Sequence, residues 1–266
     1  MSKLDIASVH DHRFGGNHLP LTFRKARRVL KKRGVGALVK RGKNELLGAV
    51  SAYLALRTKP KFQDLASLVD FTNTAFGGFL HPIQVRSEIL SLVELVQDLK
   101  PRTVLEIGTA KGGTLFLWTR VAAEDAHLIS IDLPGGGFGD GYVAWRSPVY
   151  RSFAMGKQRI ELLRGDSHSE STLEKTRMLL GENQVDLLFI DAGHTYDDVK
   201  QDFEMYSSLV APGGLIAFHD VAVHPSSTGC EVHRFWSEIK SQHESGEFIQ
   251  NTSQGWAGIG YLRWAR

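Results

Sequence analysis

The stretch LLFIDAGHTYDDVKQDF, residues 187–203, changes character abruptly where its apolar run ends. Its first residues are continuously apolar, as in a strand that is buried on both faces of a parallel sheet. Asp191 and His194 follow immediately. Thr195, with Asp198 three residues later, forms the capping pattern that starts a helix. The stretch therefore predicts a buried strand that leads through a polar turn into a helix.

The same strand-and-helix unit recurs along the chain from about residue 83. Strands are expected at 103–108, 127–132, 159–166, 185–191, 214–220 and 256–264. Helices are expected before Pro101 and at 112–123, near 149–153, at 169–181, from 195 to the turn at 211–214, and at 231–239. Apolar strands that alternate with helices predict an α/β fold whose mostly parallel sheet is covered on both faces.

Polar residues stand at the end of each of the first five expected strands. In parallel sheets the ligand lies outside the carboxyl ends of the strands, so these residues are expected to share one edge. A single acid at such a place is often only a turn residue or a helix cap, whereas five in register predict a site. The residues are Glu106 with Gly108, then Asp132, Asp166, Asp191, and the pair His219–Asp220.

The first turn after a strand reads EIGTAKGGT, residues 106–114. Its glycines let the backbone approach a ligand closely, and the next helix is expected to begin at Gly112 or Gly113. Ala110 stands where a dinucleotide-binding turn carries its second glycine, which disfavours nicotinamide cofactors. An ordinary tight turn would have the same sequence, so this motif alone decides little.

Asp132 and Asp166 each have two interpretations. Asp132, 24 residues after Gly108, can accept the hydroxyls of a ribose or can cap the loop that follows. Asp166, with Ser167, can border an adenine. Alternatively, one of the two is the N-cap of the helix that begins near Ser169.

Four segments together resemble the class I S-adenosylmethionine-dependent methyltransferases: TVLEIGTAKGGTLFLW, ISID, GDS, and the run from Val185 to Val221. Within that class they are most similar to the bacterial group of macrolide-sugar O-methyltransferases and cephalosporin-hydroxylase-like proteins. The resemblance covers about residues 80–263 and is most specific at 185–221. It implies a Rossmann-like sheet of seven strands in a methyltransferase domain, residues 79–266, after a basic helical extension, residues 1–78.

The resemblance also implies roles for individual residues. Those expected to hold S-adenosylmethionine are Glu106, Gly108, Thr109, Gly112, Asp132, Leu133, Asp166, Ser167 and Asp191. In metal-dependent relatives an acid and a polar pair hold a divalent cation at the places of Asp191, His219 and Asp220. His194 matches a general base, so the expected catalytic residues are His194, Asp191 and His219. A cation and an imidazole would both help an alcohol to lose its proton and become a nucleophile.

His219 departs from the family pattern, which has a carboxylate or a similar group there. Imidazole suits Mn²⁺, Fe²⁺, Co²⁺ or Zn²⁺ better than Mg²⁺. Either the metal is softer than magnesium, or no metal binds and His219 acts as a base or an orienting group. A third alternative makes His194 a helix cap and His219 a hydrogen-bonded core residue.

Composition limits the remaining function classes. The chain has 266 residues, 42% of them apolar, and one cysteine, Cys230, which indicates a reducing, cytoplasmic setting. We see no secretory signal and no apolar run long enough for a membrane span. Residues 24–43 contain ten Lys or Arg and no acid. They can contact an anionic membrane surface or glycan at the inner membrane, form an oligomer contact, or simply be a solvated helix face; no base-reading motif accompanies them.

The favoured hypothesis is an O-methyltransferase that acts on a small hydroxylated acceptor, such as a sugar or glycan-type natural product. The main alternative is a non-catalytic relative that binds the cofactor or a partner. Iron-dependent hydroxylase chemistry is a weaker alternative, because no second histidine of a facial triad is evident. The glycine-rich segment 134–150, with Tyr142, Trp145 and Arg146, is expected to be a lid over the site or a surface loop.

Overall fold

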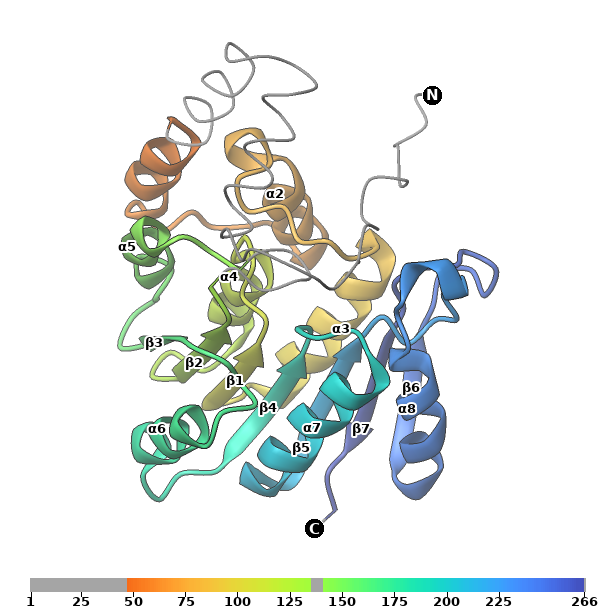
Figure 1. Ribbon diagram of the computed structural model, residues 1–266. Coiled ribbons are helices and arrows are strands. Elements are labelled where there is room, and N and C mark those ends of the chain that lie inside the picture. Colours follow the sequence, from red (N-terminus) through yellow and green to blue (C-terminus); the bar gives the residue numbers. More distant parts are fainter. Residues whose placement is uncertain (1–46, 135–140, 266) are drawn as a thin grey trace, which may run out of the picture.

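The computed structural model describes residues 47–134 and 141–265. Its centre is a seven-stranded sheet in the order β3-β2-β1-β4-β5-β7-β6 (Figure 1). Strands β1 to β5 run parallel, and β7 runs antiparallel to both of its neighbours. This confirms the expected Rossmann-like, mostly parallel sheet. The strands are β1 (Thr103–Ile107), β2 (His127–Asp132), β3 (Arg159–Arg164), β4 (Val185–Ile190), β5 (Val210–His219), β6 (Glu244–Phe248) and β7 (Ile259–Arg263).

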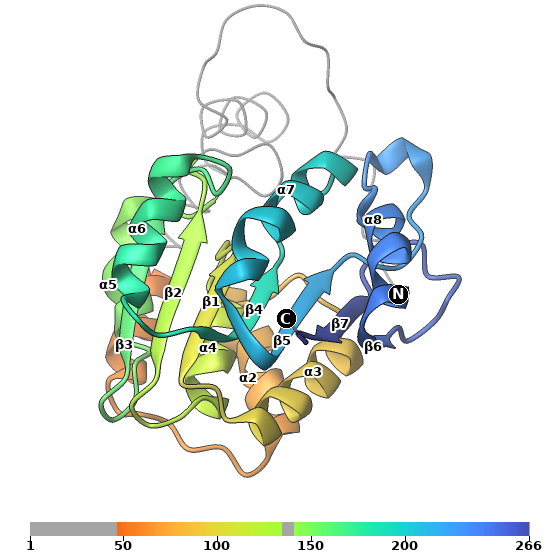
Figure 2. The ribbon, with the colours of Figure 1, turned by 90° about the horizontal axis from the view of Figure 1, so that it is seen from below.

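Helices cover both faces of the sheet (Figures 1 and 2). On one face lie α2 (Leu65–Gly78), α3 (Arg86–Leu99), α4 (Gly113–Val121) and α5 (Ser147–Arg151). On the other lie α6 (Glu170–Leu180), α7 (Tyr196–Tyr206) and α8 (Val232–Ile239). Successive residues of β4 alternate between these layers: Leu187 and Phe189 join the first core, and Leu188 and Ile190 join the second. Short 3₁₀ helices occupy Ala144–Arg146, Ser207–Leu209, Ser226–Thr228 and Lys240–Gln242.

The described part of the N-terminal extension packs into the first core. A helix that ends at residue 56 contributes Ala49, Ala52 and Leu56, and α2 contacts α3 and α4. The backbone of α2 leaves helical geometry between Ala75 and Gly77. The basic segment 24–43 lies outside the described residues. Within those residues, we find no helix with the length and apolar character required to span a membrane.

Two boundaries differ from the sequence prediction. The helix α7 ends at Tyr206, and the turn that was expected to end it, residues 211–214, belongs to β5. There Gly213 donates a hydrogen bond to Trp264 O, and Trp264 donates one to Gly214 O. The edge strand β6 was not predicted from the sequence, because none of its five residues is fully buried and it has no apolar pattern.

The segment 134–150 is not a simple lid. Residues 135–140 lie outside the described residues, but Tyr142 is buried against Tyr150, with a distance of 5.0 Å between ring centroids. Arg146 is also buried and donates a hydrogen bond to the Tyr150 hydroxyl. Both residues therefore belong to the core, and only Trp145 is exposed among the three aromatic and basic residues expected in a lid.

Candidate active site

The acids and imidazoles that follow β4 and β5 form one cluster. The strands are neighbours in register, so their carboxyl ends meet. His219 Nδ1 lies 3.1 Å from Asp191 Oδ1 and 3.3 Å from Asp220 Oδ2. His194 Nε2 lies 2.9 Å from the same Asp220 oxygen. The structure thus brings together all four residues that the sequence predicted for catalysis or metal binding.

Gln84 completes this cluster and was missed by sequence reasoning. It precedes α3, and its side-chain amide donates a 2.6 Å hydrogen bond to Asp191 Oδ2. The side chain is buried, and Gln84 Oε1 has no hydrogen-bond partner within the described part of the chain. A buried amide oxygen of this kind usually has a partner, so a ligand or water is expected beside it.

Asp220 is the centre of the cluster. Its backbone φ of +64° is a left-handed conformation, which is tolerated by Asp but uncommon outside functional sites. A third imidazole, that of His224, lies 3.2 Å from Asp220 Oδ1. Burial alone would raise the pKa of Asp220, but the charge of His219 and hydrogen bonds from the imidazoles hold it well below its usual value.

The two carboxylates require a positive charge between them. Burial opposes ionisation of His219, yet the neighbouring Asp220 and Asp191 raise the pKa of this imidazole well above its usual value. A divalent cation would meet the same requirement, because the ligand atoms of Asp191, His219 and Asp220 all lie within 4.8 Å of one another. Neighbouring ligands of one metal ion are about 3 Å apart, which matches the distances from His219 to the two acids. The residues therefore fit a metal of the Mn²⁺, Fe²⁺ or Zn²⁺ type.

A second group, Asp220 with His224 and Cys230, has similar spacing. Nδ1 of His224 donates to Ala222 O at 2.8 Å, and Nε2 lies 3.2 Å from both Asp220 Oδ1 and Ala257 N. The hydrogen bond with Asp220 raises the pKa of His224 to about 10 against the effect of burial, so we interpret His224 as a support for Asp220.

The glycine turn presses against the acid cluster. Gly108 has φ +102°, and a side chain there would lie 1.9 Å from the carbonyl oxygen of Asp191. Gly112, with φ +77°, is the N-cap residue of α4, which confirms the predicted helix start. Thr109 holds the turn from inside, because its hydroxyl is hydrogen-bonded to Ser130 and its carbonyl accepts from Gly112 N. A cofactor on this turn would therefore adjoin Asp191.

Asp132 lies at the same edge of the sheet, because β2 and β4 flank β1 and all three run parallel. One of its carboxylate oxygens accepts a 2.8 Å hydrogen bond from Ala110 N. Burial raises the pKa of Asp132 to about 6, although hydrogen bonds from backbone N–H groups work against the shift. Leu133 beside it is 46% exposed. The pair suits a ribose with an adjoining flat apolar ring.

Glu106 does not lie where the sequence analysis expected it, among the residues that face the cofactor. Its side chain is fully buried beneath the turn, where it accepts hydrogen bonds from Trp118 Nε1 at 3.1 Å and Ser130 Oγ at 2.7 Å. Burial raises its pKa to about 7. In this arrangement Glu106 supports the strand end from inside and does not reach the surface on which a cofactor would lie.

Asp166 and Ser167 are not helix caps. The N-cap of α6 is Ser169, whose hydroxyl accepts from Thr172 N. Asp166 is exposed and accepts a hydrogen bond from His168 N at 2.9 Å. Ser167 is buried, and its carbonyl accepts from the Tyr206 hydroxyl at 2.8 Å. Likewise, Thr195 and not His194 caps α7, so the cap interpretation of His194 is wrong.

His168 ties this corner to α7 and gives the fold a pH dependence. Its Nε2 lies 3.3 Å from the fully buried Asp202 carboxylate, whose hydrogen bond raises the pKa of His168 from 6.5 to about 9. Its stabilising contribution is therefore complete below about pH 6.5 and is lost as the pH rises through about 9. We expect a loss of about 1 kcal/mol over this window, because the imidazole is partly solvated.

Urea unfolding at several pH values checks this expectation. The free energy of unfolding of the wild type should decline across the window, and His168→Gln should remove that part of the decline. His81→Gln, which changes an exposed histidine before α3, is the control and should leave it intact. A decline that persists in His168→Gln would show that another group causes it.

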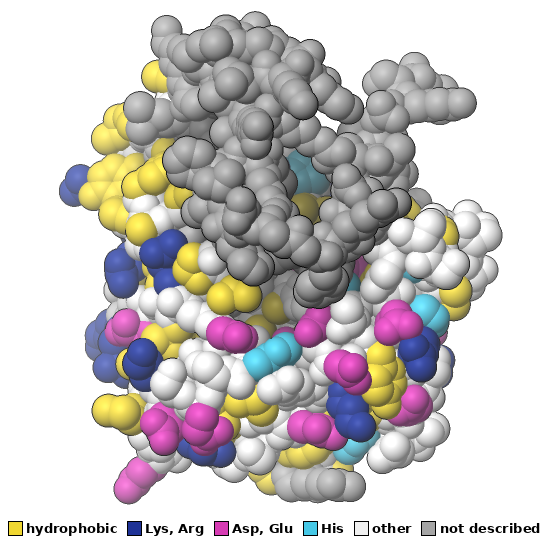
Figure 3. Space-filling view, viewed as in Figure 1, with side chains coloured by type: hydrophobic (Ala, Val, Ile, Leu, Met, Phe, Trp, Pro, Cys, Tyr) yellow, Lys and Arg dark blue, Asp and Glu magenta, His cyan; other side chains and the backbone are white. Residues whose placement is uncertain are grey.

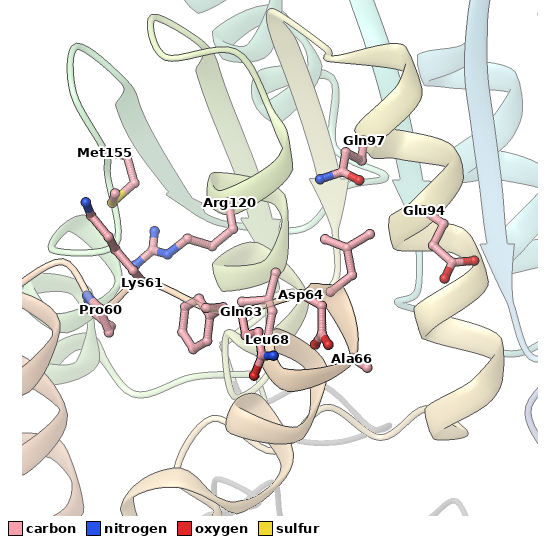
Figure 4. Close-up of a pocket in the computed structure, with 12 residues that line it drawn as sticks. Pro60, Lys61, Gln63, Asp64, Ala66, Leu68, Glu94, Gln97, Arg120 and Met155 are labelled. Carbon is pink, nitrogen blue, oxygen red and sulfur yellow. The ribbon is translucent and has the colours of Figure 1, made fainter.

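A separate cavity of about 770 Å³ lies between residues 60–68, α3 and α4 (Figure 4). Charged side chains of both signs line it, among them Lys61, Asp64, Glu94 and Arg120. Arg120 is in the last turn of α4, whereas α4 begins at the edge that carries the acids. None of the predicted site residues lines this cavity, so it is distinct from the acid–imidazole cluster.

Comparisons with known proteins agree with this geometry. Residues 105–221 match a family model described as a methyltransferase domain. An uncharacterized protein of Sinorhizobium fredii, y4gI, is 29% identical over 175 residues, which are 65% of this chain and 18% of that protein. An uncharacterized protein, R132, of Acanthamoeba polyphaga mimivirus is 32% identical over 118 residues, 44% of this chain and 51% of that one. The chain thus spans about a fifth to a half of the length of these curated relatives.

Solved structures share the fold. The O-methyltransferase TomG of Streptomyces achromogenes, involved in tomaymycin synthesis and solved with S-adenosylmethionine, has a TM-score of 0.51 and 18% identity; the match covers 77% of this chain and 92% of TomG. An O-methyltransferase of Bacillus cereus, solved with S-adenosylhomocysteine, also has a TM-score of 0.51, with 19% identity over 83% of this chain and 99% of that one. Residues 105–221 thus match a methyltransferase domain, and the seven-stranded sheet of this chain has the fold of these solved O-methyltransferases.

Proposed function

We propose that this protein transfers a methyl group from S-adenosylmethionine to a hydroxyl of a small acceptor, of the sugar or glycan natural-product type. The observation that carries the proposal is the contact between the glycine turn and the acid–imidazole cluster. A side chain at Gly108 would clash with the backbone of Asp191, so the glycine turn is in direct contact with the strand end that carries the cluster. The methyl donor is proposed to lie on this turn. A sulfonium methyl group and an activated hydroxyl can therefore meet there.

His194 is the general base in this proposal. Its Nε2 lies 2.9 Å from an Asp220 oxygen, so this carboxylate orients the imidazole and would stabilise the cation that forms when His194 takes up a proton. The acceptor hydroxyl gives its proton to His194, and its oxygen forms a bond to the methyl carbon. The carbon–sulfur bond breaks, and its electron pair stays on sulfur as S-adenosylhomocysteine leaves. The proton on His194 then passes to solvent.

Asp191, His219 and Asp220 would hold a divalent metal, of the Mn²⁺, Fe²⁺ or Zn²⁺ type, in this proposal. Such a metal, when bound, lowers the pKa of a hydroxyl that it ligates. Gln84 fixes one oxygen of Asp191, so it directs the other oxygen toward His219. Asp191 therefore orients either the metal or, without a metal, the His219 imidazole, and the acceptor oxygen would lie beside that group.

Calorimetry with the purified protein tests the cofactor assignment. S-Adenosylhomocysteine should bind with micromolar affinity or tighter, and NAD should not bind. Asp132→Ala should weaken S-adenosylhomocysteine binding by about 10- to 100-fold, the usual effect of removing a charged hydrogen-bond acceptor. Asp125→Ala, which removes an exposed carboxylate paired with Arg102, is the matched control and should leave the affinity unchanged.

Absence of S-adenosylhomocysteine binding would end the proposal. Binding without turnover, over a panel of hydroxylated acceptors and with Mn²⁺, Fe²⁺ or Zn²⁺ supplied, would favour the non-catalytic alternative. Metal analysis of the protein before and after chelation then checks the metal assignment separately, because it needs no knowledge of the acceptor.

A further inference from the structure

The helix of residues 47–56 buries Ala49, Ala52 and Leu56, whereas four other large apolar side chains face the solvent. A helix that only completes a core would bury most of its large apolar side chains. We call the exposed residues the outward stripe; they are Leu47 (54% exposed), Val50 (50%), Tyr53 (36%) and Leu54 (60%).

The inward face fixes this orientation. A side chain added at Gly48 would lie 3.1 Å from the carbonyl oxygen of Phe76 and 3.5 Å from Phe79. At Gly48 the helix backbone therefore lies too close to α2 and its C-cap for a large side chain to fit between them. Rotation of the helix to bury the stripe would place leucines in that narrow space, so the stripe stays on the surface.

Basic residues flank the outward stripe along the chain. The ten basic residues of segment 24–43 precede it, with no acid among them. Arg57 follows it, with its guanidinium 5.7 Å from the centre of the Tyr53 ring, and Lys61 is exposed nearby in the chain. Figure 3 shows apolar side chains gathered at the upper left, where this helix lies in Figure 1, with basic side chains beside them.

We propose that the outward stripe lies in the surface of an anionic lipid bilayer. This goes beyond the proposed methyl transfer and does not depend on it. A bilayer offers apolar chains to the leucines and phosphate headgroups to the flanking Lys and Arg, which is the usual arrangement of an interfacial helix. Tyr53 has the amphipathic ring that is enriched at such interfaces.

Charge also argues against two other occupants. A second copy of this chain would bring the basic residues beside the two stripes close together, and the repulsion between these like charges would weaken binding. A nucleic acid would attract the basic residues but leaves the apolar stripe without a partner, because its outer surface is phosphate. An anionic bilayer satisfies both features of this surface.

Co-sedimentation of the full chain with vesicles tests the proposal. The chain should bind vesicles of phosphatidylcholine with phosphatidylglycerol and should bind pure phosphatidylcholine vesicles weakly. Leu54→Gln should lower the partition coefficient about tenfold, the effect of withdrawing one leucine from an apolar phase. The triple change L47Q/V50Q/L54Q should lower it about a hundredfold or more.

Met178→Gln is the matched control, because Met178 is 81% exposed on α6, away from the stripe, and this change should leave the partition coefficient unaltered. Thermal unfolding of each variant should match the wild type, since the replaced side chains are already exposed. No binding to anionic vesicles, or equal binding by the triple variant, overturns the proposal. So does a dimer that sedimentation detects in the wild type and that Leu54→Gln dissociates.

Discussion

His194→Gln is expected to lower kcat/KM for methyl transfer by about 10²- to 10⁴-fold, the usual contribution of a general base. Glutamine keeps a polar side chain near Asp220 but cannot take up a proton. The affinity for S-adenosylhomocysteine should stay within about twofold, because the proposed cofactor site is formed by Gly108 and Asp132 and does not include this imidazole. Initial rates with the methyl donor at saturation, together with calorimetry, check both expectations.

The control for this change is His81→Gln, an exposed histidine that has no place in the cluster. Its rates should equal those of the wild type. If His194→Gln retained more than a third of wild-type activity, the role of His194 as a base would be wrong, and Asp220 would serve another purpose. A rise in the activity of His194→Gln toward higher pH would show that hydroxide replaces the missing base.

The cluster could be predicted because it depends on topology. Adjacent parallel strands that are joined by one helix have their carboxyl ends side by side, so Asp191 had to lie near His219 and Asp220. Gln84 could not be found in this way. It stands 107 residues before Asp191, on a loop ahead of α3, and no local pattern connects the two. Contacts of such long separation depend on how the helical layer is placed over the sheet.

Strand position also failed to predict which way each acid points. Glu106 stands at a strand end, as the other acids do, yet its side chain is in the interior. Side chains alternate across a strand, so one residue of difference separates the core from the open edge. The exact last residue of a strand is the least certain part of any sequence prediction. The strand β2 ends at Asp132, so this acid stands at the predicted strand end.

Periodicity identifies a helix but not the face that it buries. Leu47, Val50 and Leu54 recur at helical spacing, and these residues are helical. Their exposure depends on Gly48, Ala49 and Ala52, which allow a closer approach on the opposite side. The strand β6 exists but has no apolar repeat in the sequence. As an exposed edge strand it buries few side chains, so it does not need an apolar pattern.

Gly108→Ala should have the largest effect on stability. The new Cβ would lie 1.9 Å from Asp191 O and 2.5 Å from its carbonyl carbon, both of which are backbone atoms. Relief requires β1 to move from β4, which would break the hydrogen bond from Asp191 N to Ile107 O. We expect the free energy of unfolding to fall by about 4 kcal/mol or more, with S-adenosylhomocysteine binding lost in any folded protein that remains.

Gly181→Ala separates the close contact from the cost of backbone conformation. Gly181 has φ +60° at the C-cap of α6, and nothing lies within 4 Å of the added Cβ. Its replacement should cost about 1 to 3 kcal/mol, because φ +60° with ψ −120° lies outside the left-handed helical region and is a conformation of glycine. Urea unfolding of the two variants measures the difference, which reports the contact between the turn and the acid strand. If the two variants lost equal free energy of unfolding, Gly108 would not be in close contact with Asp191. The proposal that the methyl donor and the base meet at this contact would then have no support.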